Sequence, residues 1–190
     1  MEIALIDVGN VLLDVDFHKF CSKAAQIMGI GEDRIFPHFC SGPLKEELDK
    51  GLRSPASFLE QAASACNAGM NYHELKECWS DIFTLSNEAI SAVTHLRPHF
   101  KLWIMSDTDP LHFNYFQNRF PLMRSFDQYI LSYATGYLKS EEEAFRAFAQ
   151  DPHNSYTLID DKEINCATAR RCGLASVHFQ NWSQALDELL

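Results

Sequence analysis

The chain opens with an apolar run that ends abruptly in a carboxylate. Residues 3–6 are Ile-Ala-Leu-Ile, and Asp7 follows them directly. This run is too short for a helix and has no polar alternation, so it predicts a strand that is buried on both faces. Strands of this kind form parallel sheets, whose ligands bind outside the carboxyl ends of the strands. Asp7 is therefore expected at a binding edge, although a carboxylate that only caps a turn would produce the same pattern.

Several later apolar runs predict further strands, and segments of helical periodicity alternate with them. The predicted strands span residues 100–105, 129–131, 156–159 and 175–179. The predicted helices of this half span residues 89–96 and 110–119, a segment capped by Ser140, a segment closed by Gly173, and residues 183–190. Such alternation is typical of α/β folds. We therefore predict a Rossmann-like parallel sheet with helices on its faces.

Residues 14–88 contain no convincing strand pattern, and their apolar positions recur at helical spacing. Gly29 ends the first helical pattern, and Ser54 before a proline has the sequence context of a helix N-cap. This segment is expected to be an all-helical insertion. We predict an α/β core of residues 1–13 and 89–190, with residues 14–88 as a helical cap.

The composition and charge of the chain disfavour some classes of binding partner and indicate a cellular compartment. The formal net charge of -10 disfavours a nucleic acid or an anionic membrane surface as a partner. No apolar run approaches the ~20 residues that a membrane span requires, and the N-terminus lacks the pattern of a secretory signal. The 6 cysteines form no C-x-x-C pair, so reduced, mostly buried thiols are expected. These features favour a cytoplasmic protein with neither nucleic acid nor a membrane as a partner.

Polar residues follow several of the predicted strands, at the edge where the ends of parallel strands meet. The set that this edge would collect is Asp7, Ser106, Asp107, Lys139, Asp160 and Asp161. Carboxylates in one cleft repel each other unless a divalent cation lies between them. Mg²⁺ suits this position because it binds carboxylate, carbonyl and water oxygens and leaves room for a phosphate. With a hydroxyl and a lysine beside it, the set has the chemistry of phosphoryl transfer.

These motifs resemble those of the haloacid dehalogenase-like (HAD) hydrolases, over nearly the whole chain. Residues 6–12 (I-D-V-G-N-V-L) are similar to the first HAD motif in its F-D-L-G-N-V form, and residues 106–109 (S-D-T-D) to the second. Residues 136–139 (G-Y-L-K) resemble the third motif, and residues 158–161 (L-I-D-D) the fourth. In the cap, residues 49–54 (D-K-G-L-R-S) are similar to an E-x-G-x-x-S phrase. The nearest resemblance is to bacterial sugar-phosphate phosphatases of the glucose-1-phosphate phosphatase type, which carry a helical C1 cap.

The resemblance implies a magnesium-dependent phosphatase that acts on a small phosphorylated metabolite. It implies that Asp7 is the nucleophile that forms an aspartyl-phosphate. Asp7, the backbone carbonyl of Gly9 and the side chain of Asp161 would bind Mg²⁺. Ser106 and the backbone amide of Asp107 would hold the phosphate. Lys139 would act in both catalysis and phosphate binding, by balancing the charge on Asp7 and on the phosphoryl group. The cap would close over the leaving group and set the specificity.

Two departures from the resembled motifs keep other functions open. Gly9 stands where the first motif usually has a second aspartate, the general acid and base, whose loss costs roughly 10²–10⁴-fold in rate. Asp107 stands in place of a more usual asparagine. A catalytically weak or inactive HAD-like domain that binds a phosphorylated ligand or a protein is therefore the alternative, and a haloacid dehalogenase ranks below it. His18 is a weak candidate for a proton donor on the cap side, and His112 is expected to be a half-buried helix residue.

Overall fold

A five-stranded sheet forms the centre of the computed structural model, which describes residues 1–69 and 71–190. The strand order is β5-β4-β1-β6-β7, and every neighbouring pair is parallel. The strands are β1 (Glu2–Ile6), β4 (Lys101–Ser106), β5 (Gln128–Leu131), β6 (Ser155–Asp160) and β7 (Ala175–His178). The predicted parallel α/β sheet is therefore confirmed, and its strands lie within two residues of their predicted bounds.

The register of the sheet brings the polar strand ends together. β1 lies in the middle, and Ile6 pairs with Ile104 of β4 on one side and with Ile159 of β6 on the other. The backbone N–H of Asp7 donates to the carbonyl of Ile159 at 3.0 Å. Because all five strands are parallel, the residues that follow β1, β4 and β6 emerge at one edge of the sheet.

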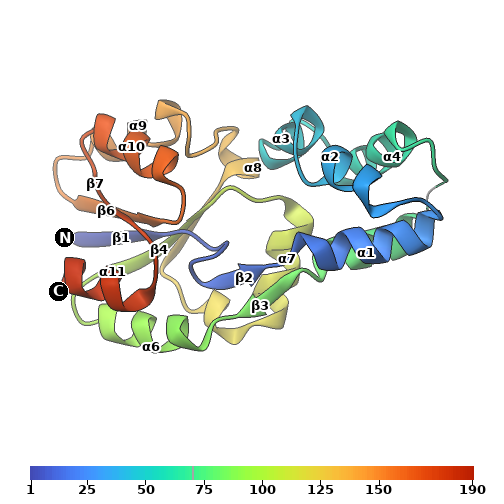
Figure 1. The fold of residues 1–190 in the computed structure, drawn as a ribbon. Helices are drawn as coiled ribbons and strands as arrows, with labels where there is room; N and C mark the ends of the chain where they lie inside the picture. The colour runs from blue at the N-terminus through green and yellow to red at the C-terminus, as the bar shows by residue number, and fades with distance from the viewer. Residues whose placement is uncertain (70) are drawn as a thin grey trace.

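Helices cover both faces of the sheet (Figure 1). α6 (Asn87–Leu96) and α11 (Trp182–Leu189) pack on one face, and α9 (Arg146–Ala149) and α10 (Glu163–Arg171) lie on the other. α7 (Pro110–Arg119) follows β4, and α8 (Ser132–Thr135) follows β5. Alternate residues of β1 serve the two cores: Ala4 and Ile6 pack with α6 and α11, whereas Ile3 and Leu5 pack on the opposite side.

A unit of helices, here called the cap, lies between residues 16 and 82. Its members are α1 (Phe17–Met28), the 3₁₀ turn η1 (Glu32–Arg34), α2 (Phe36–Phe39), α3 (Pro43–Asp49), α4 (Pro55–Ala65) and α5 (Tyr72–Ser80). The cap has its own hydrophobic core, centred on Phe20, Phe39, Phe58 and Trp79, all of them fully buried. The division into domains at residues 14 and 88 stays a prediction.

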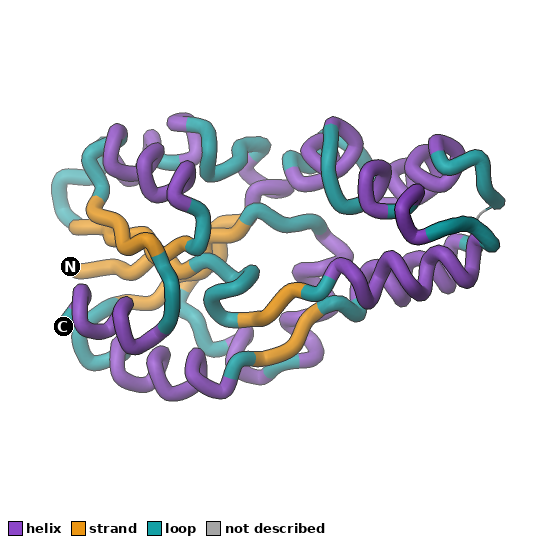
Figure 2. The backbone as a smooth tube through the Cα atoms, viewed as in Figure 1, coloured by secondary structure: helices purple, strands orange, loops and turns teal. Residues whose placement is uncertain are grey.

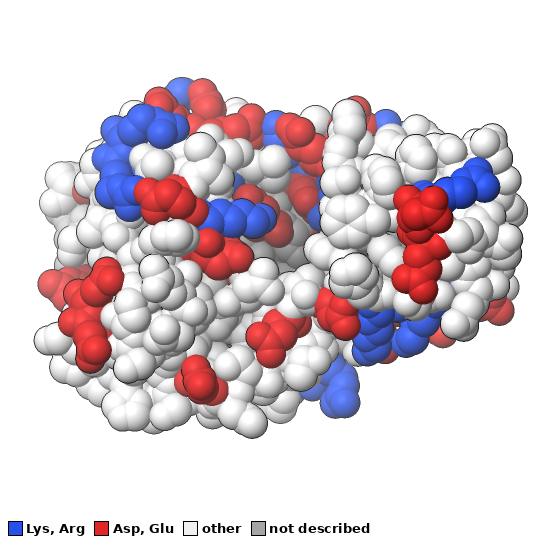
Figure 3. All heavy atoms as spheres, in the orientation of Figure 1, with Lys and Arg blue, Asp and Glu red and all other residues white. Residues whose placement is uncertain are grey.

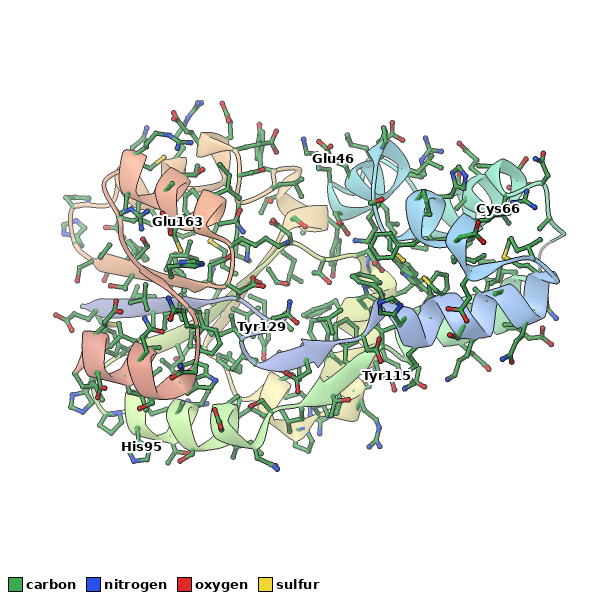
Figure 4. All side chains as sticks on the ribbon, in the orientation of Figure 1. Glu46, Cys66, His95, Tyr115, Tyr129 and Glu163 are labelled. Atoms are coloured by element: carbon green, nitrogen blue, oxygen red, sulfur yellow. The ribbon has the colours of Figure 1, made fainter. Side chains whose placement is uncertain are left out.

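The insertion is not all-helical, which corrects the sequence prediction. β2 (Leu13–Val15) and β3 (Phe83–Leu85) pair in an antiparallel ribbon that joins the cap to the sheet, and Figure 2 shows both strands. Each strand has only three residues, too few for alternation of polar and apolar positions to stand out. Beside the ribbon, Tyr115 of α7 (labelled in Figure 4) donates a hydrogen bond to Asp81 at the end of α5.

The helix predicted to begin at Ser140 is also corrected. The chain forms only a 3₁₀ turn, η3 (Glu142–Ala144), and the four-residue α9. Glu141 is drawn away from a helical first turn, because its carboxylate accepts from the backbone N–H of Leu138 at 2.8 Å and contacts Lys50 of the cap at 2.9 Å.

Across residues 1–69 and 71–190, no helix combines the length and the apolar character that crossing a bilayer would require.

Candidate active site

A cavity of about 350 Å³ lies where the ends of the strands face the cap. Figure 3 shows the surface hollowed between the two parts, with charged side chains around the hollow. The cavity is lined by all six residues that the sequence singled out for catalysis, phosphate binding and metal binding, namely Asp7, Gly9, Ser106, Asp107, Lys139 and Asp161. The fold therefore collects the predicted set in one place. Their chemical roles stay predictions.

Lys139 forms a buried ion pair with two carboxylates. Its Nζ atom lies 2.7 Å from Asp7 Oδ1 and 2.5 Å from Asp160 Oδ2. All three side chains are less than a tenth exposed. The two aspartates follow or end the neighbouring strands β1 and β6, and Lys139 reaches them from the loop after α8. The lysine therefore compensates the repulsion that two adjacent buried carboxylates would otherwise have.

The environment raises the pKa of Asp7 and also that of Lys139. Burial raises the pKa of Asp7 to about 7, with Lys139 opposing this rise and Asp160 adding to it. Burial by itself would lower the pKa of Lys139, but the carboxylates of Asp7 and Asp160 outweigh it and raise that pKa. Lys139 therefore stays a cation in the cavity wall, while Asp7 has a carboxyl group that more positive charge would ionise further.

Three carboxylates could hold a metal ion in this cavity. One oxygen from each of Asp7, Asp160 and Asp161 lies within 4.8 Å of the others. Asp160 is already engaged, since its oxygens accept from Lys139, from the side chain of Asn165 and from the backbone N–H of Lys162. Asp7 and Asp161 instead line the cavity together with Gly9. Carboxylate oxygens are the ligands that hard divalent cations prefer, so the donor set fits Mg²⁺.

The end of β4 provides a further part of the cavity lining. Ser106 is buried and lines the cavity beside Asp107 and Thr108. Asp107 has a structural contact that the sequence did not reveal, because its Oδ1 accepts from the backbone N–H of Lys139 at 3.0 Å. The backbone N–H of Thr108 donates to the hydroxyl of Ser132 at 2.9 Å. The first contact fixes the residues that follow β4 against the loop that carries Lys139, and the second fixes them against α8.

Sequence reasoning missed Asn10, whose side chain positions a candidate metal ligand. Asn10 has a φ of 56°, and its Nδ2 donates to Asp161 Oδ2 at 3.2 Å. Its Oδ1 accepts from the backbone N–H of Val15 at 3.4 Å. Asparagine tolerates a positive φ better than most residues, so a Gly-Asn dipeptide after a strand was the available signal.

The cap contributes a partly buried ion pair that was also missed. Lys45 and Asp49 of α3 both line the cavity, and Lys45 Nζ lies 2.5 Å from each carboxylate oxygen of Asp49. Their side chains are 13% and 14% exposed. Their four-residue spacing on a short helix is common on solvated surfaces, so nothing in the sequence distinguished them.

The two histidines that the sequence raised lie in different environments. His112 is buried rather than half-buried: its Nδ1 lies 2.9 Å from Asp109 Oδ2, and its Nε2 lies 2.8 Å from the carbonyl of Trp79. The ring also stacks on Trp79, and it borders the cavity. His18 is exposed at the start of α1, and it is absent from the described residues that line the cavity.

Comparison with known proteins bears on the fold. No protein-family model matches the chain. One similar structure is that of the HAD family enzyme BT-2542 from Bacteroides thetaiotaomicron, solved with magnesium and inorganic phosphate. Its TM-score is 0.82 at 23% identity, and the match covers 97% of this chain and 98% of that one. A predicted HAD-like family hydrolase from Porphyromonas gingivalis matches with a TM-score of 0.78 at 20% identity, over 100% of this chain and 97% of that one.

A more distant structure is that of L-2-haloacid dehalogenase from Xanthobacter autotrophicus, solved with chloropropionic acid covalently bound. Its TM-score is 0.66 at 14% identity, with 93% of this chain and 76% of that one covered. All three structures share the arrangement found here along most or all of the chain. The chain therefore has the fold of the HAD-like hydrolases.

Proposed function

We propose that this protein is a HAD-type hydrolase that cleaves a small phosphomonoester through an aspartyl-phosphate on Asp7. The observation that carries the proposal is the cavity itself, where Asp7 and Asp161 follow the neighbouring parallel strands β1 and β6 and Lys139 reaches Asp7 from the loop after α8. The similar structure from Bacteroides thetaiotaomicron contains magnesium and inorganic phosphate, which supports the same chemistry for this fold.

In this proposal Asp7 attacks the phosphorus atom with one carboxylate oxygen. The bond to the leaving oxygen breaks, and the phosphoryl group stays bound to Asp7. Water then attacks the phosphorus atom and releases Asp7 as a free carboxylate. The side chain of Ser106 lines the cavity and donates its hydroxyl to the phosphoryl oxygens. Lys139, 2.7 Å from Asp7, keeps a positive charge beside the reacting carboxylate and the developing charge on the phosphoryl group.

Magnesium is the proposed cofactor, held by Asp7, the backbone of Gly9 and Asp161. Bound there, the ion would neutralise charge on the phosphoryl oxygens and keep the Asp7 carboxyl ionised. Asn10 orients Asp161 for this role through its 3.2 Å hydrogen bond. Asp160 positions Lys139 rather than binding the metal, because its carboxylate accepts from Lys139 and is itself held by Asn165.

Two other functions have a specific observation in their favour. Gly9 lacks a side chain where the resembled motif has an acid, and this favours a domain that binds a phosphorylated ligand or a protein without turnover. The fold similarity to L-2-haloacid dehalogenase favours halide displacement by Asp7. A dehalogenase of this kind would use Asp7 without the metal. The paired acids Asp7 and Asp161 beside Lys139 therefore favour the phosphatase.

The test is hydrolysis of a panel of phosphomonoesters, with and without Mg²⁺, by the wild type and by Asp7→Asn. The panel includes hexose 1-phosphates, because the motifs resemble glucose-1-phosphate phosphatases. A separate assay with L-2-chloropropionate tests for dehalogenase activity. Turnover that requires Mg²⁺ and disappears in Asp7→Asn would support the phosphatase. Phosphate binding without turnover would favour the binding domain, and chloride release without metal would favour the dehalogenase.

A further inference from the structure

The missing acid at position 9 leaves one step of the proposed reaction without a proton donor. Gly9 has no side chain, yet an alkoxide leaving from phosphorus needs a proton and the water that attacks the aspartyl-phosphate must lose one. Burial and geometry restrict which groups lining the cavity can serve. His112 has both ring nitrogens engaged, by Asp109 and by the carbonyl of Trp79. Lys162 is exposed, so water competes for its ammonium group.

Lys45 is a different kind of group, because it is a shielded cation on the cap side of the cavity. Asp49 accepts from it with both oxygens at 2.5 Å, which fixes the position of the Nζ atom. The Nζ atom also lies 5.8 Å from the centre of the Trp79 ring. An ammonium group has three N–H bonds, so one that is held by a single carboxylate retains a donor for a ligand in the cavity.

We propose that Lys45 is the general acid and base of this enzyme, supplied by the cap in place of the carboxylate missing at position 9, with Asp49 as its positioning residue. This inference rests on the proposed phosphatase function. The core supplies the nucleophile, Asp7, and the phosphoryl-binding groups, and the cap wall supplies the proton. A leaving group bound between core and cap therefore meets Lys45 where it departs.

The proton balance of the two half-reactions is closed. In the first, Asp7 forms a bond to phosphorus, the bond to the ester oxygen breaks, and Lys45 gives its proton to that oxygen, releasing an alcohol. In the second, water attacks the phosphoryl group, the bond between phosphorus and Asp7 breaks, and the Lys45 amine takes the proton of the water. Phosphate leaves, and Lys45 is again an ammonium group.

The experiment compares Lys45→Met with the wild type on two esters whose leaving groups differ. The alcohol of glycerol 2-phosphate needs a proton to leave, whereas p-nitrophenolate leaves without one. We expect kcat/KM of Lys45→Met to fall roughly 10²–10⁴-fold on glycerol 2-phosphate, and by about tenfold at most on p-nitrophenyl phosphate. Because the second half-reaction also lacks its base, the phosphorylated form should accumulate during p-nitrophenyl phosphate turnover, which mass spectrometry of the acid-quenched protein detects.

Lys76→Met is the matched control, because Lys76 is an exposed lysine on α5 of the same cap and should change neither ester's rate. Asp49→Asn, which alters only the positioning residue, should show the same preference for p-nitrophenyl phosphate with a smaller loss. An equal loss on both esters, or no loss, would overturn the role of Lys45 while leaving the phosphatase intact. Failure of the wild type to hydrolyse either ester would instead count against the proposed function, and this inference would fall with it.

Discussion

The ammonium group of Lys139 lies 2.5 Å from the carboxylate of Asp160, and both side chains are almost completely buried. Asp7 shares the same cation at 2.7 Å, so one lysine neutralises part of the charge of two acids. A buried ion of this kind contributes to stability mainly through the penalty that its partners would suffer without it. Lys139 therefore has a structural role, because it holds the ends of β1 and β6 together through these two ion pairs.

We predict that Lys139→Met lowers the free energy of unfolding by about 3–5 kcal/mol, because Asp7 and Asp160 lose their cation. Urea unfolding near neutral pH, with a chelator present, measures this loss. Lys162→Met is the control, since Lys162 lines the same cavity but is exposed. This variant should change the free energy of unfolding by no more than about 0.5 kcal/mol. Equal stability of the two variants would show that the buried pair contributes little.

Lys139→Met should also change the ionisation of Asp7. The lysine opposes the rise of the pKa of Asp7, which is raised to about 7 by burial, so removing the cation raises that pKa further. More of the Asp7 carboxyl is then protonated at neutral pH, and Mg²⁺ binding should weaken and should recover as the pH is raised. Calorimetric titration with Mg²⁺ at several pH values tests this, and a pH-independent affinity would contradict it.

The sequence indicated the sheet and the set of polar strand ends because both depend on local patterns. Asp7 and Asp160 each come at the end of a short apolar run, and parallel pairing alone brings them together. Lys45 and Asp49 could not be found in this way, because their position depends on how α3 packs in the cap. The β2–β3 ribbon was hidden for another reason, since three-residue strands depend on pairing across about seventy intervening residues.

Restoring an acid at position 9 should rescue the loss of Lys45. A Cβ atom at Gly9 would lie 3.3 Å from the Cγ2 atom of Val15, a side-chain methyl group that can shift slightly, so Gly9→Asp should fold. We predict that Gly9→Asp raises kcat/KM on glycerol 2-phosphate by at least about tenfold in the Lys45→Met background, and by less in the wild type, where Lys45 already serves. Equal effects in the two backgrounds would show that the groups act independently.

Gly51 allows the cap to approach the core closely, and a larger residue there should be costly. Its φ is 67°, and an added Cβ atom would lie 2.1 Å from the carbonyl oxygen of Tyr133 in α8. Gly29 has a similar φ of 65° but nothing within 4 Å of an added Cβ atom. Gly29→Ala should therefore lower the free energy of unfolding only by the backbone strain, about 1–2 kcal/mol. Gly51→Ala should lower it by clearly more, because the added Cβ atom also collides with Tyr133. Thermal unfolding of both variants makes the comparison, and equal losses would argue against the close contact.

Asp109 should make stability depend on pH in the acid range. Burial raises its pKa, but the charge and hydrogen bond of His112, with Lys45 nearby, outweigh this and lower the pKa of Asp109 below its usual value. The unfolded chain then binds more protons at this group than the folded protein, so the stability it contributes is present above the unfolded pKa of about 4 and is lost as the pH falls through the folded pKa.

Asp109→Asn removes this titrating group, so comparison with the wild type isolates the contribution of Asp109 to the loss of stability at acid pH. At about pH 6 the variant should be less stable than the wild type by about 3 kcal/mol, because His112 and the indole N–H of Trp79 lose a charged acceptor. The difference should shrink as the pH is lowered from about 4 towards 2.5, since the carboxyl of the unfolded wild-type chain then takes up a proton that the folded carboxyl does not, whereas the variant has no such group. Urea unfolding across this range measures the difference directly, and carboxylates common to both proteins cancel from it. A difference that stays constant with pH would mean that Asp109 keeps an ordinary pKa in the folded protein.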